Sequence, residues 1–419
     1  MKSRISLWVL LPLVTLILSA CSVGKTTEDN LSPEDAPQST EIDNFDSQDD
    51  STSTPVEHID ADCADPFKGI NPTFRTDGWD TNFCLHSIDY DDIFSGGPPR
   101  DGIPPLDAPQ FETVQSADAW IEDLEPVIIF ELDGIVRAYP LQILTWHEIV
   151  NDEVGGSPIA VTFCPLCNTA LVFQRPTIDG ETLTFGTSGN LRYSDLVMWD
   201  RQTESWWQQF NGEAIVGDLT GTRLELLPSA IISWADFKDK FPAGEVLSIE
   251  TGFMRSYGRN PYSGYDNINS FPFAYTGNLD GQLPPMARVL GIQLKDEQGG
   301  AFSLEMLMEK QILNQVLGET PIAIFWKAGT ASALDSGSIA DGRDIGTTGV
   351  FDSRINGQAL TFISLENGTF LDQETKSTWD ILGEALEGPL AGSRLVPLPH
   401  HDTFWFAWAA FVPTGSLVE

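Results

Sequence analysis

The sequence predicts a β-rich α+β fold in which two tandem copies of one unit form a pseudo-symmetric body. Short apolar runs alternate with Asp-Gly and Gly-Gly turns, a pattern typical of short strands joined by tight turns. The second half also repeats short sequences of the first half in the same order, which indicates a duplicated unit. The chain has 419 residues, of which 41% are hydrophobic, so it is long enough for two or three packed units.

The N-terminus has the pattern of an export signal. In residues 1–21, two basic residues precede an apolar run from Leu7 to Leu18, and the sequence LSAC ends at Cys21. These last letters resemble a bacterial lipobox, which implies a lipid on Cys21; an ordinary signal peptide that ends in Cys is the alternative. Residues 22–65 are acidic and rich in Ser, Thr and Pro, so we expect a disordered spacer.

The formal net charge of −38 argues against nucleic acid as a partner, because like charges repel one another. An exported protein held by its lipid at the extracytoplasmic or periplasmic face of a bacterial membrane fits the sequence better. The lipid bilayer, reached through Cys21, is therefore the partner that we expect. No pattern in the sequence indicates a protein partner.

An N-terminal arm over residues 66–124 is expected to precede the first copy. Cys63 and Cys84 stand 21 positions apart near its start. In an oxidising compartment they could form a disulfide that fastens the arm to the body. The spacing allows this disulfide without requiring it.

The two predicted copies cover residues 125–250 and 288–419, with a connecting segment over residues 251–287. The sequence DRQTESWW after Trp199 is echoed by DQETKSTW after Leu371, and GEAIVGDLTGTRLELLP is echoed by GEALEGPLAGSRLVPLP. In the first copy we expect a strand over residues 127–132, a helix that begins near Pro140, and strands that flank the Gly-Gly turn.

The most reactive side chains of the first copy lie in TWHEIVNDEVGGSPIAVTFCPLCNTALVFQ, residues 145–174. This stretch contains His147 and a Cys-x-x-Cys pair, Cys164 and Cys167. Imidazole and two thiolates suit copper, zinc or iron, so the first interpretation is a transition-metal site. A fourth ligand could come from one of three further residues: Met198, His86 or Asp195.

Two other interpretations of the cysteine pair stay open. The pair could work as a thiol-disulfide oxidoreductase, with His147 stabilising or deprotonating the attacking thiol. It could also be a structural disulfide in a ligand-binding or scaffold protein without chemistry at the cysteines. Neither interpretation names a substrate or a reaction.

The comparison between the copies separates this site from its scaffold. At a constant offset of 163 positions, the glycines and prolines near the motif recur, but its reactive residues do not. The aligned pairs are His147 with Lys310, Cys164 with Lys327, and Cys167 with Thr330. This loss predicts a site in the first copy and a structural or covering role for the second.

The motif region resembles a known bacterial family. AYPLQILTWHEIVNDEVGGSPIAVTFCPLCNTALVF and TFGTSGNLRYSDLVMWDRQTESWWQ are similar to the family called domain of unknown function 3179, as are HSIDYDDIFSGGPPRDGIPPLDAP and FWFAWAAFVP. The resemblance covers about residues 80–416. It implies an exported family without a settled activity.

Overall fold

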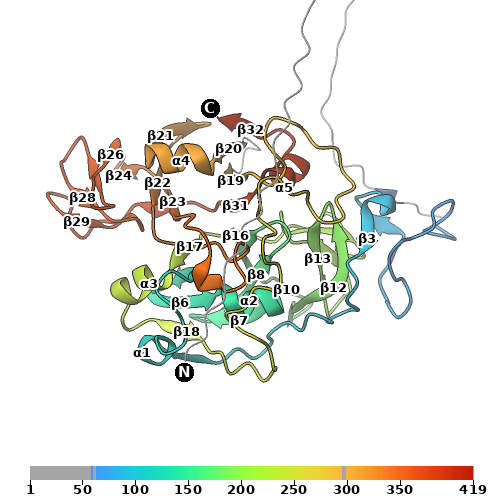
Figure 1. Cartoon of the computed structure of the whole chain (residues 1–419). Helices are drawn as coiled ribbons and strands as arrows, with labels where there is room; N and C mark the ends of the chain where they lie inside the picture. The colour runs from blue at the N-terminus through green and yellow to red at the C-terminus, as the bar shows by residue number, and fades with distance from the viewer. Residues whose placement is uncertain (1–57, 60–62, 295–298, 419) are drawn as a thin grey trace, which may run out of the picture. The chain divides into compact units, whose positions relative to one another are not determined.

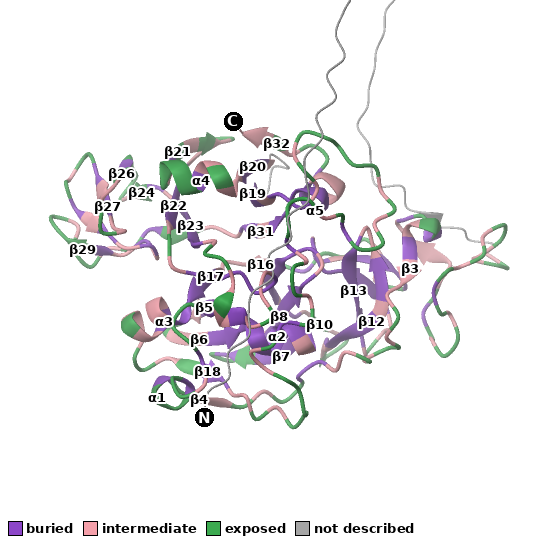
Figure 2. Cartoon of the chain, viewed as in Figure 1, coloured by how far each residue is buried: buried purple, intermediate pink, exposed green. Residues whose placement is uncertain are grey.

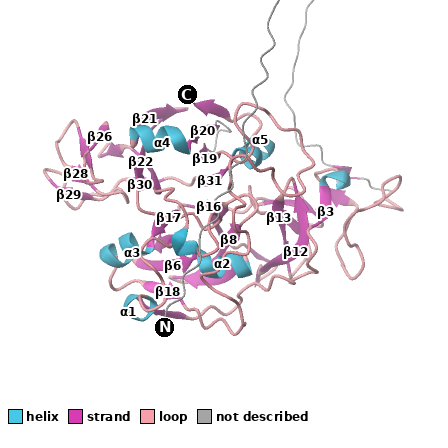
Figure 3. Cartoon of the chain, in the orientation of Figure 1, coloured by secondary structure: helices cyan, strands magenta, loops and turns pink. Residues whose placement is uncertain are grey.

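The computed structural model describes residues 58–59, 63–294 and 299–418, and within them the protein is β-rich with short helices (Figure 3). The α-helices have at most seven residues each. They are α1 (Val114–Ala117), α2 (Leu141–His147), α3 (Trp234–Lys240), α4 (Leu304–Lys310) and α5 (Trp405–Phe411). The β-rich class that the sequence predicted is confirmed. In the described residues, no helix is long and apolar enough to cross a bilayer.

The chain up to residue 247 forms three larger sheets and one hairpin (Figure 1). The first sheet has the order β17 (Ala230–Ser233), β5 (Pro126–Leu132), β6 (Ile135–Pro140), β18 (Glu245–Leu247) and β4 (Phe111–Thr113). The second has the order β16 (Leu226–Leu227), β9 (Thr169–Gln174), β8 (Ser157–Cys164) and β7 (Ile149–Val154). The third has the order β1 (His58–Ile59), β2 (Leu85–His86), β15 (Glu213–Val216), β14 (Trp206–Gln208), β13 (Asp195–Asp200), β12 (Phe185–Arg192) and β3 (Ile93–Ser95). The hairpin joins β10 (Thr177–Ile178) to β11 (Glu181–Thr182).

The chain from residue 288 onward forms the remaining sheets. One has the order β31 (His401–Phe404), β19 (Arg288–Gln293), β20 (Gly299–Ser303) and β32 (Ser416–Val418). Another has the order β21 (Ile312–Leu317), β22 (Thr320–Lys327), β23 (Thr347–Asp352) and β30 (Val396–Pro397). A third has the order β26 (Phe362–Ser364), β27 (Phe370–Asp372), β28 (Thr378–Trp379) and β29 (Ala385–Glu387), and a hairpin joins β24 (Arg354–Ile355) to β25 (Gln358–Ala359).

The strand pairing of the first half recurs in the second half. The order β17-β5-β6-β18 corresponds to β31-β19-β20-β32, and in both sheets only the last pair is parallel. A seven-residue helix follows the third strand of each order in the sequence, α2 after β6 in the first half and α4 after β20 in the second. Two-residue turns with positive φ connect the strands of the hairpins β10-β11 and β24-β25, at Asp179-Gly180 and Asn356-Gly357. The right-handed twist of paired strands favours such turns.

Apolar side chains of both halves share one core. Phe163 and Phe173 from the first half are buried in the same cluster as Phe404 and Trp405 from the second. The purple segments in Figure 2 show that the strands around β8 and β13 are largely buried. The turn between β8 and β9 is therefore enclosed by protein from both halves.

Two of the predicted features concern the N-terminal part of the chain. Cys63 and Cys84 form a disulfide, with their Cα atoms 5.8 Å apart. The predicted lipidation site, Cys21, and the predicted spacer up to residue 57 lie outside the described residues.

Each half also contains a buried aspartate that fixes a tight loop. Asp200 Oδ1 accepts hydrogen bonds from the Thr203 amide (2.7 Å) and hydroxyl (2.9 Å), and Oδ2 accepts one from Trp207 Nε1 (2.8 Å). In the second half, Asp372 Oδ2 accepts from Trp379 Nε1 at 2.9 Å. This shared contact explains why the sequence D-x-x-T-x-S-x-W occurs twice.

We predict that Asp200→Asn destabilises the protein by about 2 kcal/mol, because the new NH₂ group must face an N–H or O–H donor in a buried site. Urea unfolding followed by tryptophan fluorescence measures the change. Asp372→Asn is the matched variant in the second half and should give a loss of the same order. A change below about 0.5 kcal/mol in both variants would contradict the structural role assigned to these loops.

Candidate metal centre

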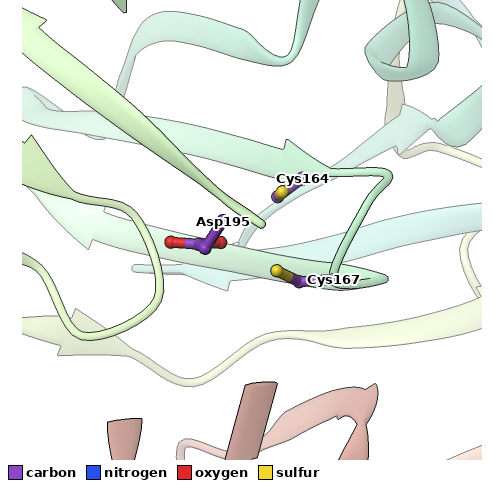
Figure 4. A group of neighbouring side chains, drawn as sticks. All are labelled: Cys164, Cys167 and Asp195. Atoms are coloured by element: carbon purple, nitrogen blue, oxygen red, sulfur yellow. The ribbon is translucent and has the colours of Figure 1, made fainter. Parts of the chain in front are cut away.

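Three acidic side chains meet in the interior of the first half. The sulfur atoms of Cys164 and Cys167 and a carboxylate oxygen of Asp195 all lie within 4.8 Å of one another, and all three residues are buried. Figure 4 shows both sulfur atoms pointing toward the Asp195 carboxylate. Cys164 and Cys167 are free thiols in the structure.

The cysteine turn, residues 164–168, brings the two sulfurs together. Cys164 ends β8 and pairs with Thr169 at the start of β9, so the residues between them form a short hairpin loop. Pro165 suits this loop because its ring fixes φ, and Asn168 has a φ of 56°, a conformation that Asn tolerates better than most residues. The second half braces the loop, because Phe404 N and Thr403 Oγ1 both donate to the Cys167 carbonyl at 3.0 Å.

Asp195 is held opposite the cysteine turn by a strained hairpin. Tyr193 and Ser194, which join β12 to β13, have φ values of 49° and 67°, which side chains without glycine's freedom rarely adopt. The Ser194 carbonyl accepts a hydrogen bond from Cys167 Sγ at 3.4 Å. The hairpin thus places the first residue of β13 beside the thiols.

The two carboxylate oxygens of Asp195 differ in their hydrogen-bond donors. Oδ2 accepts hydrogen bonds from Gln208 Nε2 and from the Phe210 amide, the latter at 3.0 Å. Oδ1 is buried and accepts no hydrogen bond from a nitrogen or oxygen donor among the described residues. A buried carboxylate oxygen in this state is free to bind a cation.

Glu148 is a fourth acidic group near these three. It follows the last residue of α2, has a φ of 59°, and is only 6% exposed. Its carboxyl group has no hydrogen bond or ion pair among the described residues. Together, Glu148, Cys164, Cys167 and Asp195 are called the acidic cluster below.

Burial raises the pKa of every group in the acidic cluster, because the charged form loses its hydration. Burial raises the pKa of Glu148 to about 8, and the Asp195 charge adds to this shift. Burial also raises the pKa of Asp195 to about 6, although hydrogen bonds from Gln208 and the thiols partly oppose it. The pKa of the Cys164 thiol is raised by burial and by the charges of Asp195 and Glu148, and that of Cys167 is raised further.

His147 has hydrogen-bond partners other than the cysteines. It is not among the residues whose ligand atoms meet in the described part of the chain. Both ring nitrogens are occupied, Nδ1 by the Pro104 carbonyl and Nε2 by the Tyr257 hydroxyl, each at 2.7 Å. Because a carbonyl can only accept, Nδ1 carries the proton and Nε2 accepts from Tyr257, so His147 fastens the connecting segment. Its role as a metal ligand stays a prediction.

Met198 and His86, two of the predicted further ligands, contact other groups in the structure. Met198 is fully buried in the main apolar core and pairs with Trp207 across the strands. His86 lies in β2, where Nδ1 is 2.8 Å from the Ile88 carbonyl and the ring lies against Tyr90. Asp195, the third option, is the one that lies with the cysteines.

Glu148 was missed by the sequence analysis, although a signal was present. At the offset of 163 positions it aligns with Gln311, which has nearly the same backbone conformation at the end of α4, with a φ of 60°. The second half therefore has an amide where the first has an acid. The residues aligned with the two cysteines are not acidic either. Lys327, which aligns with Cys164, forms an ion pair with Asp236, and Thr330, which aligns with Cys167, forms a hydrogen bond with Thr347.

Comparison with known proteins identifies the family. The model of the family described as "Protein of unknown function (DUF3179)" matches residues 100–415, which include the whole acidic cluster. The chain belongs to this family. Neither the comparison with curated proteins nor the comparison with solved structures found a match. Membership in DUF3179 names no reaction.

For the metal-free protein we predict that the free energy of unfolding falls as pH rises. The pKa of Glu148 is about 8 in the folded protein and 4.5 ordinarily, so between these values the folded state keeps a proton that the unfolded chain has lost. Glu148→Gln should make this fall less steep by about 1.4 kcal/mol per pH unit between pH 5.5 and 7. Urea unfolding in the presence of a chelator measures both slopes, and equal slopes would contradict the raised pKa.

Proposed function

We propose that this DUF3179 protein is an extracytoplasmic, membrane-anchored protein that binds a transition-metal ion between Cys164, Cys167 and Asp195. The observation that supports the proposal most directly is the convergence of two thiols and a carboxylate within 4.8 Å in a buried site. Asp195 Oδ1 strengthens it, because this buried oxygen accepts no hydrogen bond from a nitrogen or oxygen donor among the described residues and a bound cation would satisfy it.

The lack of basic side chains bonded to the acidic cluster also supports a bound cation. Neither Asp195 nor Glu148 has a salt bridge to a lysine or arginine among the described residues. Without a basic partner, the acidic cluster can be neutralised only by protons or by a bound cation. A divalent ion would replace the protons of the thiols and would offset the burial that raises the pKa of both thiols and of Asp195.

The donor atoms narrow the choice of metal. Two thiolates favour copper, zinc or iron, and the hard carboxylate shifts the preference toward zinc or ferrous iron and away from cuprous copper. Three protein ligands also leave a position open to water or to another ligand. A site of this composition is suited to a working centre as well as to a structural one.

A thiol-disulfide function is less well supported. An exchange thiol is activated by a lowered pKa, usually beside a positive charge. Here burial and the neighbouring acids raise the pKa of both thiols, which leaves little thiolate at neutral pH.

The location outside the cytoplasm and the lipid at Cys21 rest on the sequence of the first 21 residues. The Cys63–Cys84 disulfide agrees with this location, because disulfides persist mainly in oxidising compartments.

We also infer that the two halves arose by duplication of one unit. The support is the aligned sequence echoes together with the recurrent strand order of residues 126–247 and 288–418. The second copy has exchanged its acidic set for Gln311, Lys327 and Thr330, while residues 403 and 404 support the cysteine turn of the first.

The metal proposal predicts about one ion per chain after the protein is loaded with Zn²⁺ and desalted. Cys164→Ser, Cys167→Ser and Asp195→Asn should each lower the affinity at least tenfold, because each removes one ligand. Competition with a chromophoric chelator measures the affinity, and elemental analysis measures the content. An unchanged affinity in all three variants would overturn the proposal.

Two further variants test the predicted ligands that lie outside the three-residue group. His147→Gln and Met198→Leu should keep the metal within about threefold of the wild-type affinity, because neither residue belongs to the group. Loss of metal in His147→Gln with an unchanged circular dichroism spectrum would restore His147 as a ligand.

A further inference from the structure

A cavity of about 490 Å³ lies beside the acidic cluster. Glu148 lines it, as does Leu166 from the cysteine turn, and Leu196 follows Asp195 into the same wall. Its volume is within the range of about 300–1,000 Å³ that is usual for pockets that bind small molecules. The cavity therefore places room for a ligand next to the proposed metal site.

The lining of the cavity combines one acid with aromatic rings. Tyr262, Tyr265 and Phe273 all contribute to it, and it contains no lysine, arginine or histidine. Phe273 is 50% exposed, so the cavity meets solvent on its side. Aromatic faces attract cations, and an acid in the same cavity reinforces that attraction.

Glu148 supplies the acidic group, which an entering ammonium ion would favour in its ionised form. Its residue is only 6% exposed, yet its carboxyl has no hydrogen bond or ion pair among the described residues and borders the cavity. Burial raises the pKa of this carboxyl, and the charge of Asp195 adds to the shift. An entering positive charge would satisfy this carboxyl, whereas an entering anion would face only acids and aromatic rings.

We propose that this cavity binds a small organic ammonium ion with an aromatic or apolar body, which pairs with Glu148 and lies against Tyr262, Tyr265 and Phe273. The proposal deepens the proposed function, since it rests on the acidic cluster as a functional site. It remains consistent with a bound divalent ion, because two thiolates and one carboxylate carry three negative charges and keep the site net negative.

Three probes of similar size and different charge test the ligand class: benzylammonium, benzamide and benzoate. Isothermal titration calorimetry on the zinc-loaded protein at pH 7 should show benzylammonium binding at least ten times more tightly than benzamide. Benzoate should bind more weakly than either probe. Equal binding of benzoate and benzylammonium would overturn the proposal.

Two variants assign the binding to this cavity. Glu148→Gln should weaken benzylammonium binding about tenfold and change benzamide binding by less than about twofold, as expected for the loss of one partly buried ion pair. The variant should fold, because Gln311 occupies the corresponding backbone conformation in the second half. Ile103→Trp, which fills the cavity from its wall, should weaken all of the probes. Unchanged benzylammonium binding in both variants would contradict the proposal.

The metal content of the same samples separates this proposal from the metal site. Zinc retained in Glu148→Gln together with lost amine binding supports the cavity proposal as stated. Zinc bound by a wild-type protein that binds no amine would overturn the cavity proposal and leave the metal site standing. Amine binding by a wild-type protein that binds no zinc would support the cavity and overturn the metal site.

Discussion

The burial of acidic groups without a basic partner is the constraint on which the rest of the site depends. Cys164, Cys167, Asp195 and Glu148 are enclosed by the core, and this burial is the largest contribution to the raised pKa of each. The charge of Asp195 adds to the shift of Glu148 and of both thiols. Such an arrangement is stable only when protons or a cation occupy it. The strained Tyr193-Ser194 hairpin adds to the cost of this arrangement, and strain of this kind concentrates at functional sites.

The surrounding fold makes that arrangement rigid. The thiols lie on a hairpin loop between two buried strands, Asp195 begins a strand of a different sheet, and Glu148 directly follows a helix. Backbone contacts from residues 403 and 404 connect the loop to the other half of the chain. Rigid elements from separate parts of the sequence therefore set the distances between the acidic groups, which a loop alone could not fix.

Much of the fold could be predicted from the sequence, because local signals determine it. Asp-Gly and Asn-Gly turns, apolar runs and the echoes around Asp200 and Asp372 indicated short strands in a recurring order. The cysteine pair was also visible, since two thiols three residues apart meet at any tight turn. Local patterns offered Asp195 only as one of three possible further ligands, because its position beside Cys167 depends on long-range strand pairing.

The direction of the His147 ring could not be predicted from local sequence patterns either. It stands beside Glu148 in the sequence, but the positive φ at Glu148 changes the chain direction at the helix end. The imidazole contacts Pro104 and Tyr257, while the next side chain borders the cavity by the thiols. Of these two neighbouring residues, Glu148 belongs to the acidic cluster and His147 contacts Pro104 and Tyr257. The direction of a single residue is set by tertiary packing and is not readable from spacing.

X-ray absorption spectroscopy of the metal-loaded protein is the most direct test of the central claim. If Cys164, Cys167 and Asp195 bind zinc, the spectrum will require two sulfur neighbours at about 2.3 Å and oxygen neighbours at about 2.0–2.2 Å. A first shell that contains no sulfur, in a protein with one bound zinc per chain, would contradict the account.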